Sequence, residues 1–155
     1  MKRILSFTYG WVVPAVLLLT ACSTEPKPVP YGNANCTHCN MTITDVRYGA
    51  ELVNDKGKPY FFDAVECLAT YVNSKPEEGQ KASFLMVTNF SNPTELLKVN
   101  EAYFVRSAAL PSPMGMNLLA VSTAQAAEKI QQEQGAELLT WDQVLAIVKN
   151  NEKHH

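Results

Sequence analysis

Residues 47–72 read RYGAELVNDKGKPYFFDAVECLATYV and contain the pattern that decides the fold class. Arg47 to Val53 predicts a β-strand. Asn54 to Gly57 has the composition of a tight turn, and Lys58 to Phe62 predicts the second strand of the same hairpin. The first half of this segment therefore predicts two antiparallel strands.

A helix is expected directly after the hairpin. Asp63 has the character of a helix N-cap because Glu66 follows three residues later, and Ala64 to Val72 carries an apolar pattern of helical period. Lys75 to Lys81 predicts a polar loop with a proline and a glycine, and Phe84 to Thr88 predicts a short apolar strand. The order is strand, strand, helix, strand.

The same order returns roughly 55 to 60 residues later, without residue identity high enough to call it a sequence repeat. Its predicted elements are strands at 102–108 and 116–121, a helix at 123–134 with a capping box of Ser122 and Gln125 and a stop at Gly135, a strand at 137–139, and a last helix that begins at Thr140 with Gln143 and ends near Asn150. Each half alone is too small for a secure core, so the halves should pack together. The sequence predicts an α+β fold of two similar ββαβ units packed together, plus a C-terminal helix.

The N-terminus inflates the 46% hydrophobic content of the 155 residues. Met1 to Arg3 is a short basic start, and Trp11 to Ala21 is an apolar run too short to span a bilayer comfortably. Residues 1–21 therefore have the features of a secretory signal peptide. Removing them leaves 134 residues, enough for one modest core, and excludes a large multidomain enzyme.

The net charge of the exported part argues against one class of protein. Without Lys2 and Arg3 the exported part has 11 basic residues against 15 acidic ones, a net charge near −4. A nucleic-acid-binding protein would need a basic patch, which the sequence does not provide. No nucleic-acid partner is expected.

Leu19-Thr20-Ala21-Cys22 resembles the lipobox of bacterial lipoproteins. That resemblance implies a diacylglycerol on the Cys22 thiol, cleavage before Cys22, and acylation of the new amine, as by palmitate. Two or three acyl chains anchor a protein far more firmly than one. Ser23, rather than aspartate, favours the outer over the inner membrane, with the protein facing the periplasm. The alternative is an ordinary signal peptide that is cut beside a cysteine.

Residues 23–35 read STEPKPVPYGNAN. Three alternate prolines exclude a helix and favour extended polyproline II, which at about 3.1 Å per residue would hold a domain up to roughly 40 Å from the bilayer. We therefore expect a lipidated tether over residues 22–35, a folded domain over residues 36–150 and a flexible tail over residues 151–155.

The run Cys36-Thr37-His38-Cys39-Asn40-Met41 carries the chemistry. A Cys-x-x-Cys pair in an exported chain has three ordinary interpretations: a disulfide, a thioredoxin-like redox pair or half of a zinc site. The redox interpretation expects the pair between a strand and a helix, whereas here it precedes the β-type residues Thr42 to Thr44. A zinc site needs a second ligand pair, and Cys67 is the one further cysteine outside the lipobox.

Met41 separates these interpretations. A thioether is a neutral, soft donor that suits Cu(I) and is a poor ligand for zinc. Side chains two residues apart on an extended segment point the same way, so Cys39 and Met41 would converge on one ion. The motif therefore favours a soft Cu(I) site at Cys39 and Met41, completed by Cys36 and by His38.

Four elements of the chain together resemble the NosL family of copper-binding lipoproteins, the accessory proteins of nitrous oxide reductase. They are the lipobox cysteine Cys22, the C-x-x-C-x-M run, Phe61-Phe62-Asp63, and Pro113-Met114-Gly115. The resemblance implies a fold of two similar ββαβ units and a membrane-tethered Cu(I) metallochaperone rather than an enzyme. It also implies, as partner, the copper-site maturation machinery of nitrous oxide reductase in denitrification.

This sequence matches some positions of the family's site more closely than others. Cys39 and Met41 match the core of the family motif, while Cys36 matches a position open to ligand, redox or spare-thiol roles. Asn40 stands where the family often has glycine, and Ala64 stands where the family favours a second acid. Met114 and Met116 are either secondary copper ligands or buried hairpin methionines.

Three further expectations complete the interpretation. Cys67 lies on the apolar face of the first helix and is interpreted as a buried structural thiol. His154 and His155 are expected to be solvated on a frayed tail. The alternative functions are an extracytoplasmic thiol–disulfide oxidoreductase that uses Cys36 and Cys39, and a lipoprotein adaptor whose thiols are paired.

Overall fold

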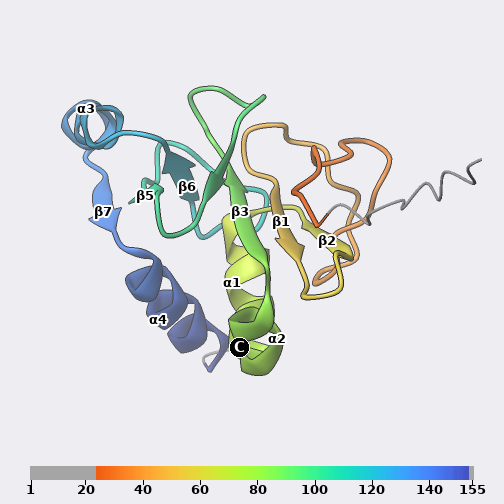
Figure 1. Cartoon of the computed structure of the whole chain (residues 1–155). Coiled ribbons are helices and arrows are strands. Elements are labelled where there is room, and N and C mark those ends of the chain that lie inside the picture. The colour runs from red at the N-terminus through yellow and green to blue at the C-terminus, as the bar shows by residue number, and fades with distance from the viewer. Residues whose placement is uncertain (1–23, 154–155) are drawn as a thin grey trace, which may run out of the picture.

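The computed structural model describes residues 24–153 (Figure 1). Its elements, in chain order, are β1 (Ala50–Val53), β2 (Pro59–Phe62), α1 (Val65–Ser74), α2 (Pro76–Lys81), β3 (Phe84–Thr88), β4 (Leu96–Lys98), β5 (Tyr103–Arg106), β6 (Leu118–Val121), α3 (Ala124–Gln134), β7 (Glu137–Leu139) and α4 (Trp141–Glu152). Among the described residues no helix is both long enough and apolar enough to cross a membrane.

The strands form two antiparallel sheets with the same local order. In the first sheet, β1 is flanked by β2 and β3, with β4 added at the outer edge of β3; in the second sheet, β5 is flanked by β6 and β7. In each sheet the helix lies between the second and third strands along the chain. The predicted α+β fold with two similar ββαβ units and a C-terminal helix is confirmed.

The two units share one main core. Buried side chains of both halves, among them Phe62 and Leu68 from the first and Phe104 and Val144 from the second, belong to a single hydrophobic cluster. Asn89 after β3 forms a parallel bridge with Ala120 of β6. Helix α4 packs along α1, as Figure 1 shows. Burying one core between two small sheets gives each half the stability that it lacks alone.

Helix α1 begins one residue later than predicted. Its N-cap is Ala64, without any side-chain cap, so the prediction that Asp63 caps the helix is wrong. The Asp63 side chain is instead buried, and its Oδ1 atom has no hydrogen-bond partner among the described residues. The cap of α3 is also shifted by one residue, because the hydroxyl of Thr123, rather than that of Ser122, accepts a hydrogen bond from the Ala126 amide.

Two short elements were absent from the sequence prediction. The predicted loop at 75–81 contains α2, which has proline at its first position and Glu77 and Glu78 in its first turn, all favourable at a helix N-terminus. The three-residue edge strand β4 has no counterpart in the prediction. Helix α4 also continues to Glu152, past the expected end of the domain at residue 150.

The proline-rich segment lies against the first sheet. The Lys27 amide donates to both carboxylate oxygens of buried Glu51 at 3.1 and 2.9 Å, and Val29 is buried. The Tyr31 hydroxyl lies 2.9 Å from the hydroxyl of Thr88. The prediction of a tether that ends at residue 35 is therefore wrong for residues 27–35, which belong to the folded domain. Cys22, the predicted signal peptide and the two terminal histidines lie outside the described residues.

Candidate metal centre

The C-x-x-C-x-M run forms the tip of a small hairpin that precedes β1. Asn35 and Thr42 form an antiparallel bridge, and Cys36 and Met41 face each other across the hairpin. The backbone N–H to O distances that close it are 2.7 Å for Gly32 to Ile43, 2.9 Å for Ile43 to Ala34, 2.8 Å for Cys36 to Met41 and 2.9 Å for Asn40 to Cys36. The motif is thus a closed loop held by its own backbone.

This geometry corrects the prediction that Cys39 and Met41 converge along an extended strand. Asn40 between them has φ 62°, in the left-handed region, so the chain reverses direction there. Glycine adopts this conformation most readily and asparagine is among the few other residues that tolerate it, which explains the residue type at this position. Met41 is 53% exposed, and Cys39 is half-buried.

A third thiol completes the cluster. The Sγ atoms of Cys36, Cys39 and Cys67 all lie within 4.8 Å of one another, and all three thiols are free. Cys36 and Cys67 are buried, with 2% and 1% of their surface exposed. The prediction that Cys67 is buried is confirmed, but its interpretation as a merely structural thiol left out a member of the site.

One backbone hydrogen bond positions the hairpin of the C-x-x-C-x-M run next to Cys67. The Thr37 amide donates to the Phe61 carbonyl at 2.8 Å, which fixes the loop beside the end of β2. The chain then passes through Asp63 into α1, and Cys67 occupies the third position of that helix. The thiols of the loop therefore lie over the first turn of α1.

Cys36 is the ionised thiol of the cluster. Hydrogen bonds from the Cys67 thiol and from the backbone amides of Cys39, Asp63 and His38 lower its pKa to about 5, against the effect of burial. The same hydrogen bond, together with burial, raises the pKa of Cys67, and burial raises the pKa of Cys39. At neutral pH the cluster holds one thiolate and two protonated thiols.

Two buried carboxyl groups lie near the thiols. Burial and the charge of Cys36 raise the pKa of Asp63, and burial raises the pKa of Glu66 on α1. Ser112 donates a hydrogen bond to Glu66 Oε1, while Glu66 Oε2 has no partner among the described residues. The Glu66–Ser112 contact joins α1 to the loop between β5 and β6.

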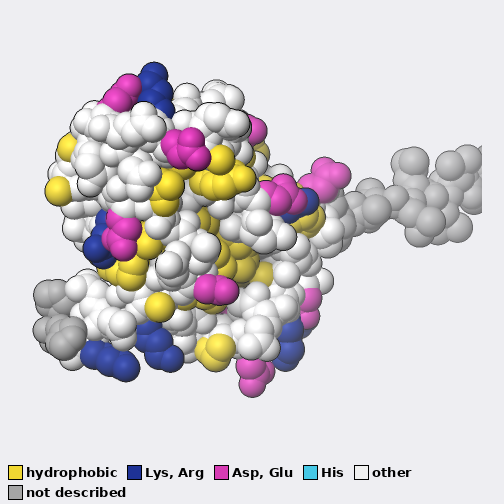
Figure 2. Space-filling model, turned by 90° about the vertical axis from the view of Figure 1, so that its left-hand side faces the viewer, with side chains coloured by type: hydrophobic (Ala, Val, Ile, Leu, Met, Phe, Trp, Pro, Cys, Tyr) yellow, Lys and Arg dark blue, Asp and Glu magenta, His cyan; other side chains and the backbone are white. Residues whose placement is uncertain are grey.

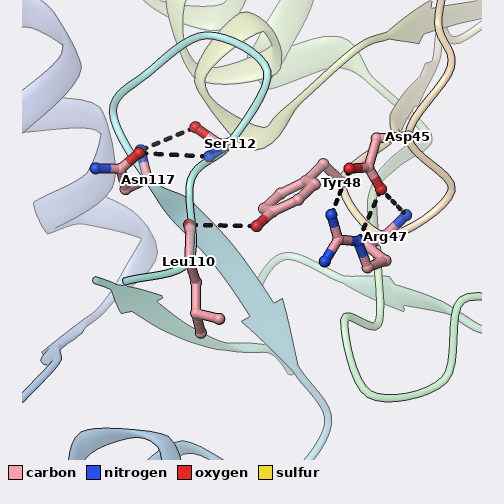
Figure 3. Close-up of polar contacts among 6 residues, drawn as sticks. All are labelled: Asp45, Arg47, Tyr48, Leu110, Ser112 and Asn117. Carbon is pink, nitrogen blue, oxygen red and sulfur yellow. Dashed lines mark hydrogen bonds and ion pairs between the residues drawn. The ribbon is translucent and has the colours of Figure 1, made fainter. Parts of the chain in front are cut away.

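That loop carries Met114 and Met116 and is held at several points (Figure 3). The Asn117 amide donates to Ser112 Oγ at 2.8 Å, and the Ser112 amide donates to Asn117 Oδ1 at 3.4 Å. The Tyr48 hydroxyl donates to the Leu110 carbonyl at 3.2 Å. The Ser112–Asn117 bonds close the methionine loop, residues 110–117, on itself, and the Tyr48 bond joins it to the first half of the molecule.

The methionine loop and the thiol cluster meet at one small pocket of about 100 Å³. Its lining residues are His38, Glu66, Cys67, Thr70, Met114, Met116, Val148 and Asn151. The structure therefore brings three predicted site residues, His38, Met114 and Met116, to the side of Cys67. Met41 does not line this pocket.

Known proteins share the family and the fold of this chain. The chain matches the model of the NosL family over residues 30–147. The fold is similar to the crystal structure of the copper chaperone NosL from Shewanella denitrificans, with a TM-score of 0.67 and 20% sequence identity over 77% of this chain and 95% of that chain. No curated protein matches the sequence.

Proposed function

Because the chain belongs to the NosL family, we propose that it is a Cu(I)-binding metallochaperone that supplies copper for the maturation of nitrous oxide reductase. The chaperone would be anchored by a lipid on Cys22 and would face the periplasm, with the outer membrane favoured over the inner. Its direct partner would belong to the machinery that assembles the copper centres of that reductase after export. It would not itself be an enzyme.

The observation that carries the proposal is the group of three thiols within 4.8 Å of one another. Thiolates are soft donors that favour Cu(I), and a tetrahedral zinc site would need a fourth ligand. Two of the thiols are buried, which protects a bound Cu(I) ion from solvent. A site of three sulfurs holds copper while leaving room for an incoming ligand from a recipient.

The individual residues have different roles in this proposal. Cys36 is already ionised at neutral pH and forms the first bond to copper without losing a proton. Cys39 is half-buried and is the ligand nearest to solvent among the three. Met41 is exposed beside Cys39 and offers a weak thioether to an ion that enters or leaves there.

One observation favours the alternative of a thiol–disulfide oxidoreductase. A thiolate with a pKa of about 5 beside two further thiols is the arrangement that redox enzymes use. However, Cys36 is 2% exposed, so a substrate disulfide has no direct access to it. This alternative also gives Met41 no role.

Titration of the fully reduced protein with Cu(I), in competition with a chromophoric chelator and without oxygen, tests the copper site. We expect one tightly held Cu(I) and much weaker binding in Cys39→Ser and, to a smaller extent, in Met41→Ala. Met86→Leu, on β3, is a matched control that should bind as the parent does. Equal affinity in the parent and in Cys39→Ser would refute the site, and catalytic reduction of a test disulfide would favour the redox alternative.

Two cellular measurements test the remaining parts of the proposal. Cells that lack this chain should make nitrous oxide reductase with reduced copper content, measured on the purified reductase. Labelled palmitate should be incorporated into the parent and not into Cys22→Ser. A reductase with full copper content would contradict the proposed delivery.

A further inference from the structure

A groove of about 580 Å³ lies between the proline-rich segment and the first sheet. Its lining combines residues of that segment with residues of β3, of β4 and of the loop between these strands: Pro26, Pro28, Val29, Met86, Pro93 and Leu96. Lys27 is the one charged residue among those that line the groove. The lining therefore suits an uncharged, apolar ligand.

The proline-rich segment forms a fixed wall of this groove. The Lys27 amide donates to both carboxylate oxygens of Glu51 on β1, and the Cα of Glu51 pairs with that of Met86 on β3. The Tyr31 hydroxyl lies 2.9 Å from the hydroxyl of Thr88 at the end of β3. The segment is thus bonded to the sheet at both ends of the part that lines the groove. The groove belongs to the folded domain and is not a gap beside a free tether.

The groove also lies where the chain enters the folded domain, on the side of β1 and β2 (Figure 1). Pro26, its first lining residue, follows Cys22 by four residues. Four extended residues span at most about 14 Å, so a lipid on Cys22 would begin within that distance of Pro26. The position of the groove therefore points to the lipid of this same chain as its ligand.

Apolar exposure elsewhere on the domain lacks this relation to the anchor. Figure 2 views the face formed by α3, β7 and α4, where hydrophobic side chains are also exposed. Leu138 of β7 is 38% exposed. These elements lie away from the proline-rich segment (Figure 1), so Leu138 is a control for apolar exposure alone.

We propose that the groove binds one acyl chain of the lipid on Cys22, which folds back onto its own domain while the remaining chains stay in the bilayer. The proposal rests on the lipid anchor of the proposed function and adds where one of its chains lies. A saturated acyl chain has neither charge nor hydrogen-bonding groups, and burial of its methylene groups favours binding. Lys27 is exposed, so its ammonium group stays in water.

The bound chain would change how the protein sits on the membrane. A single acyl chain gives weak, reversible membrane binding, whereas two chains anchor a protein stably. An anchor of three chains with one in the groove would therefore remain stable. The groove side of the domain would then face the bilayer, because it is tied to the anchor by both the peptide and the lipid.

Photo-crosslinking of the full chain in its own cells tests the proposal. Cells receive palmitate that carries a diazirine on its acyl chain and are irradiated, and the purified protein is digested with trypsin for mass spectrometry. We expect a crosslink, within one molecule, between the lipidated peptide that begins at Cys22 and peptide 82–98, which contains Met86 and Leu96. Leu96→Asp places a charge in the groove and should lower the yield about tenfold or more. Leu138→Asp, the matched control, should crosslink as the parent does.

A second groove variant guards against an effect on folding, because Leu96 is half-buried. Thr94 is exposed and also lines the groove, so Thr94→Asp should lower the crosslink yield without disturbing the core. Circular dichroism compares the fold of all variants with that of the parent. Equal yields in the parent and in both groove variants would refute the site.

The identity of the crosslinked partner distinguishes the remaining outcomes. A crosslink from peptide 82–98 to a phospholipid or to free palmitate would overturn the proposal in favour of a foreign lipid. A crosslink that joins two copies of the chain, seen as a dimer on a denaturing gel, would contradict folding back onto the same domain. Label on Cys22 without any crosslink to peptide 82–98 would refute the groove alone. Absence of label on Cys22 would mean that the lipid anchor of the proposed function fails as well.

Discussion

The two ββαβ units have the same strand order, but their helices are buried to different extents. Of the ten residues of α1, seven are buried, and they form the continuous run from Val65 to Tyr71. Of the eleven residues of α3, only Ala127 is buried. One topology thus yields a central helix in the first half and a peripheral helix in the second.

The N-termini of these two helices also differ, in their residues and in their capping. The third position is Cys67 in α1 and Ala126 in α3. Helix α3 has an ordinary side-chain cap, whereas α1 has none, and the Asp63 amide before it donates to the Cys36 thiolate instead. The buried helix start thus forms part of the three-thiol cluster, whereas the exposed helix has a side-chain cap.

The largest expected effect is on copper affinity. Cys67→Ser removes one of three sulfur donors and should weaken Cu(I) binding by about a thousandfold, or about 4 kcal/mol. Competition titration with a chelator measures this change. Ala126→Cys, which places a thiol at the matching position of α3, should not add a second tight Cu(I), because the three described thiols already form one cluster at α1. Tight binding of a second Cu(I) ion by that variant would contradict the difference between the two halves.

The next effect is on stability. Leu68→Ala opens a cavity at a fully buried position of α1 and should lower the free energy of unfolding by about 3 kcal/mol. Ile130→Ala on α3 removes a partly buried side chain and should cost about 1 kcal/mol. Urea unfolding of the copper-free, reduced variants measures both values. Equal costs would mean that α3 is as central to the core as α1.

A third effect is the release of protons on copper binding. At pH 7 Cys36 is ionised, whereas the raised pKa values of Cys39 and Cys67 keep both protonated. Binding to all three thiolates should therefore release about two protons, and affinity should rise about a hundredfold per pH unit above pH 5. Below about pH 5 the dependence should steepen, because Cys36 must then also lose a proton. Release of one proton, followed with a pH indicator, would show that one of the two protonated thiols stays out of the site.

The smallest expected effect is the loss of stability when the N-cap of α3 is removed. Thr123→Ala should lower the free energy of unfolding by about 1 kcal/mol and leave copper affinity unchanged, since α3 packs mainly on β5, β6 and β7 rather than on α1. Gln125→Ala is the control, because this exposed residue was predicted to complete a capping box that does not form; its cost should stay within about 0.5 kcal/mol. A loss of copper affinity in Thr123→Ala would show that the two halves are coupled.

Local pattern was sufficient to predict most of the fold. The alternation before and after the turn at Asn54, the helical period after Asp63 and the stop at Gly135 all report interactions within a few residues. Gly135 has φ 61°, as a helix C-cap requires. The misplaced cap at Asp63 shows the limit of this reasoning, because burial removed its side chain from the helix end.

The site was only partly predictable for the same reason. Cys36, Cys39 and Met41 are close in sequence, so their spacing drew attention to them. Cys67 was predicted to be buried, but its neighbours depend on the contact between Thr37 and Phe61, which no periodicity encodes. The docking of the proline-rich segment at Lys27 likewise depends on Glu51, a buried acid within a strand.

The docking of the proline-rich segment changes how far this protein can reach. With the lipid that we propose on Cys22, only residues 23–26 lie between the anchored cysteine and Lys27, which Glu51 holds. The five residue steps from Cys22 to Lys27 span at most about 18 Å, less than half of the roughly 40 Å that a free segment would allow. The domain would then work in a thin layer next to the bilayer, where it meets membrane-bound partners by lateral diffusion and has little access to proteins in the open periplasm.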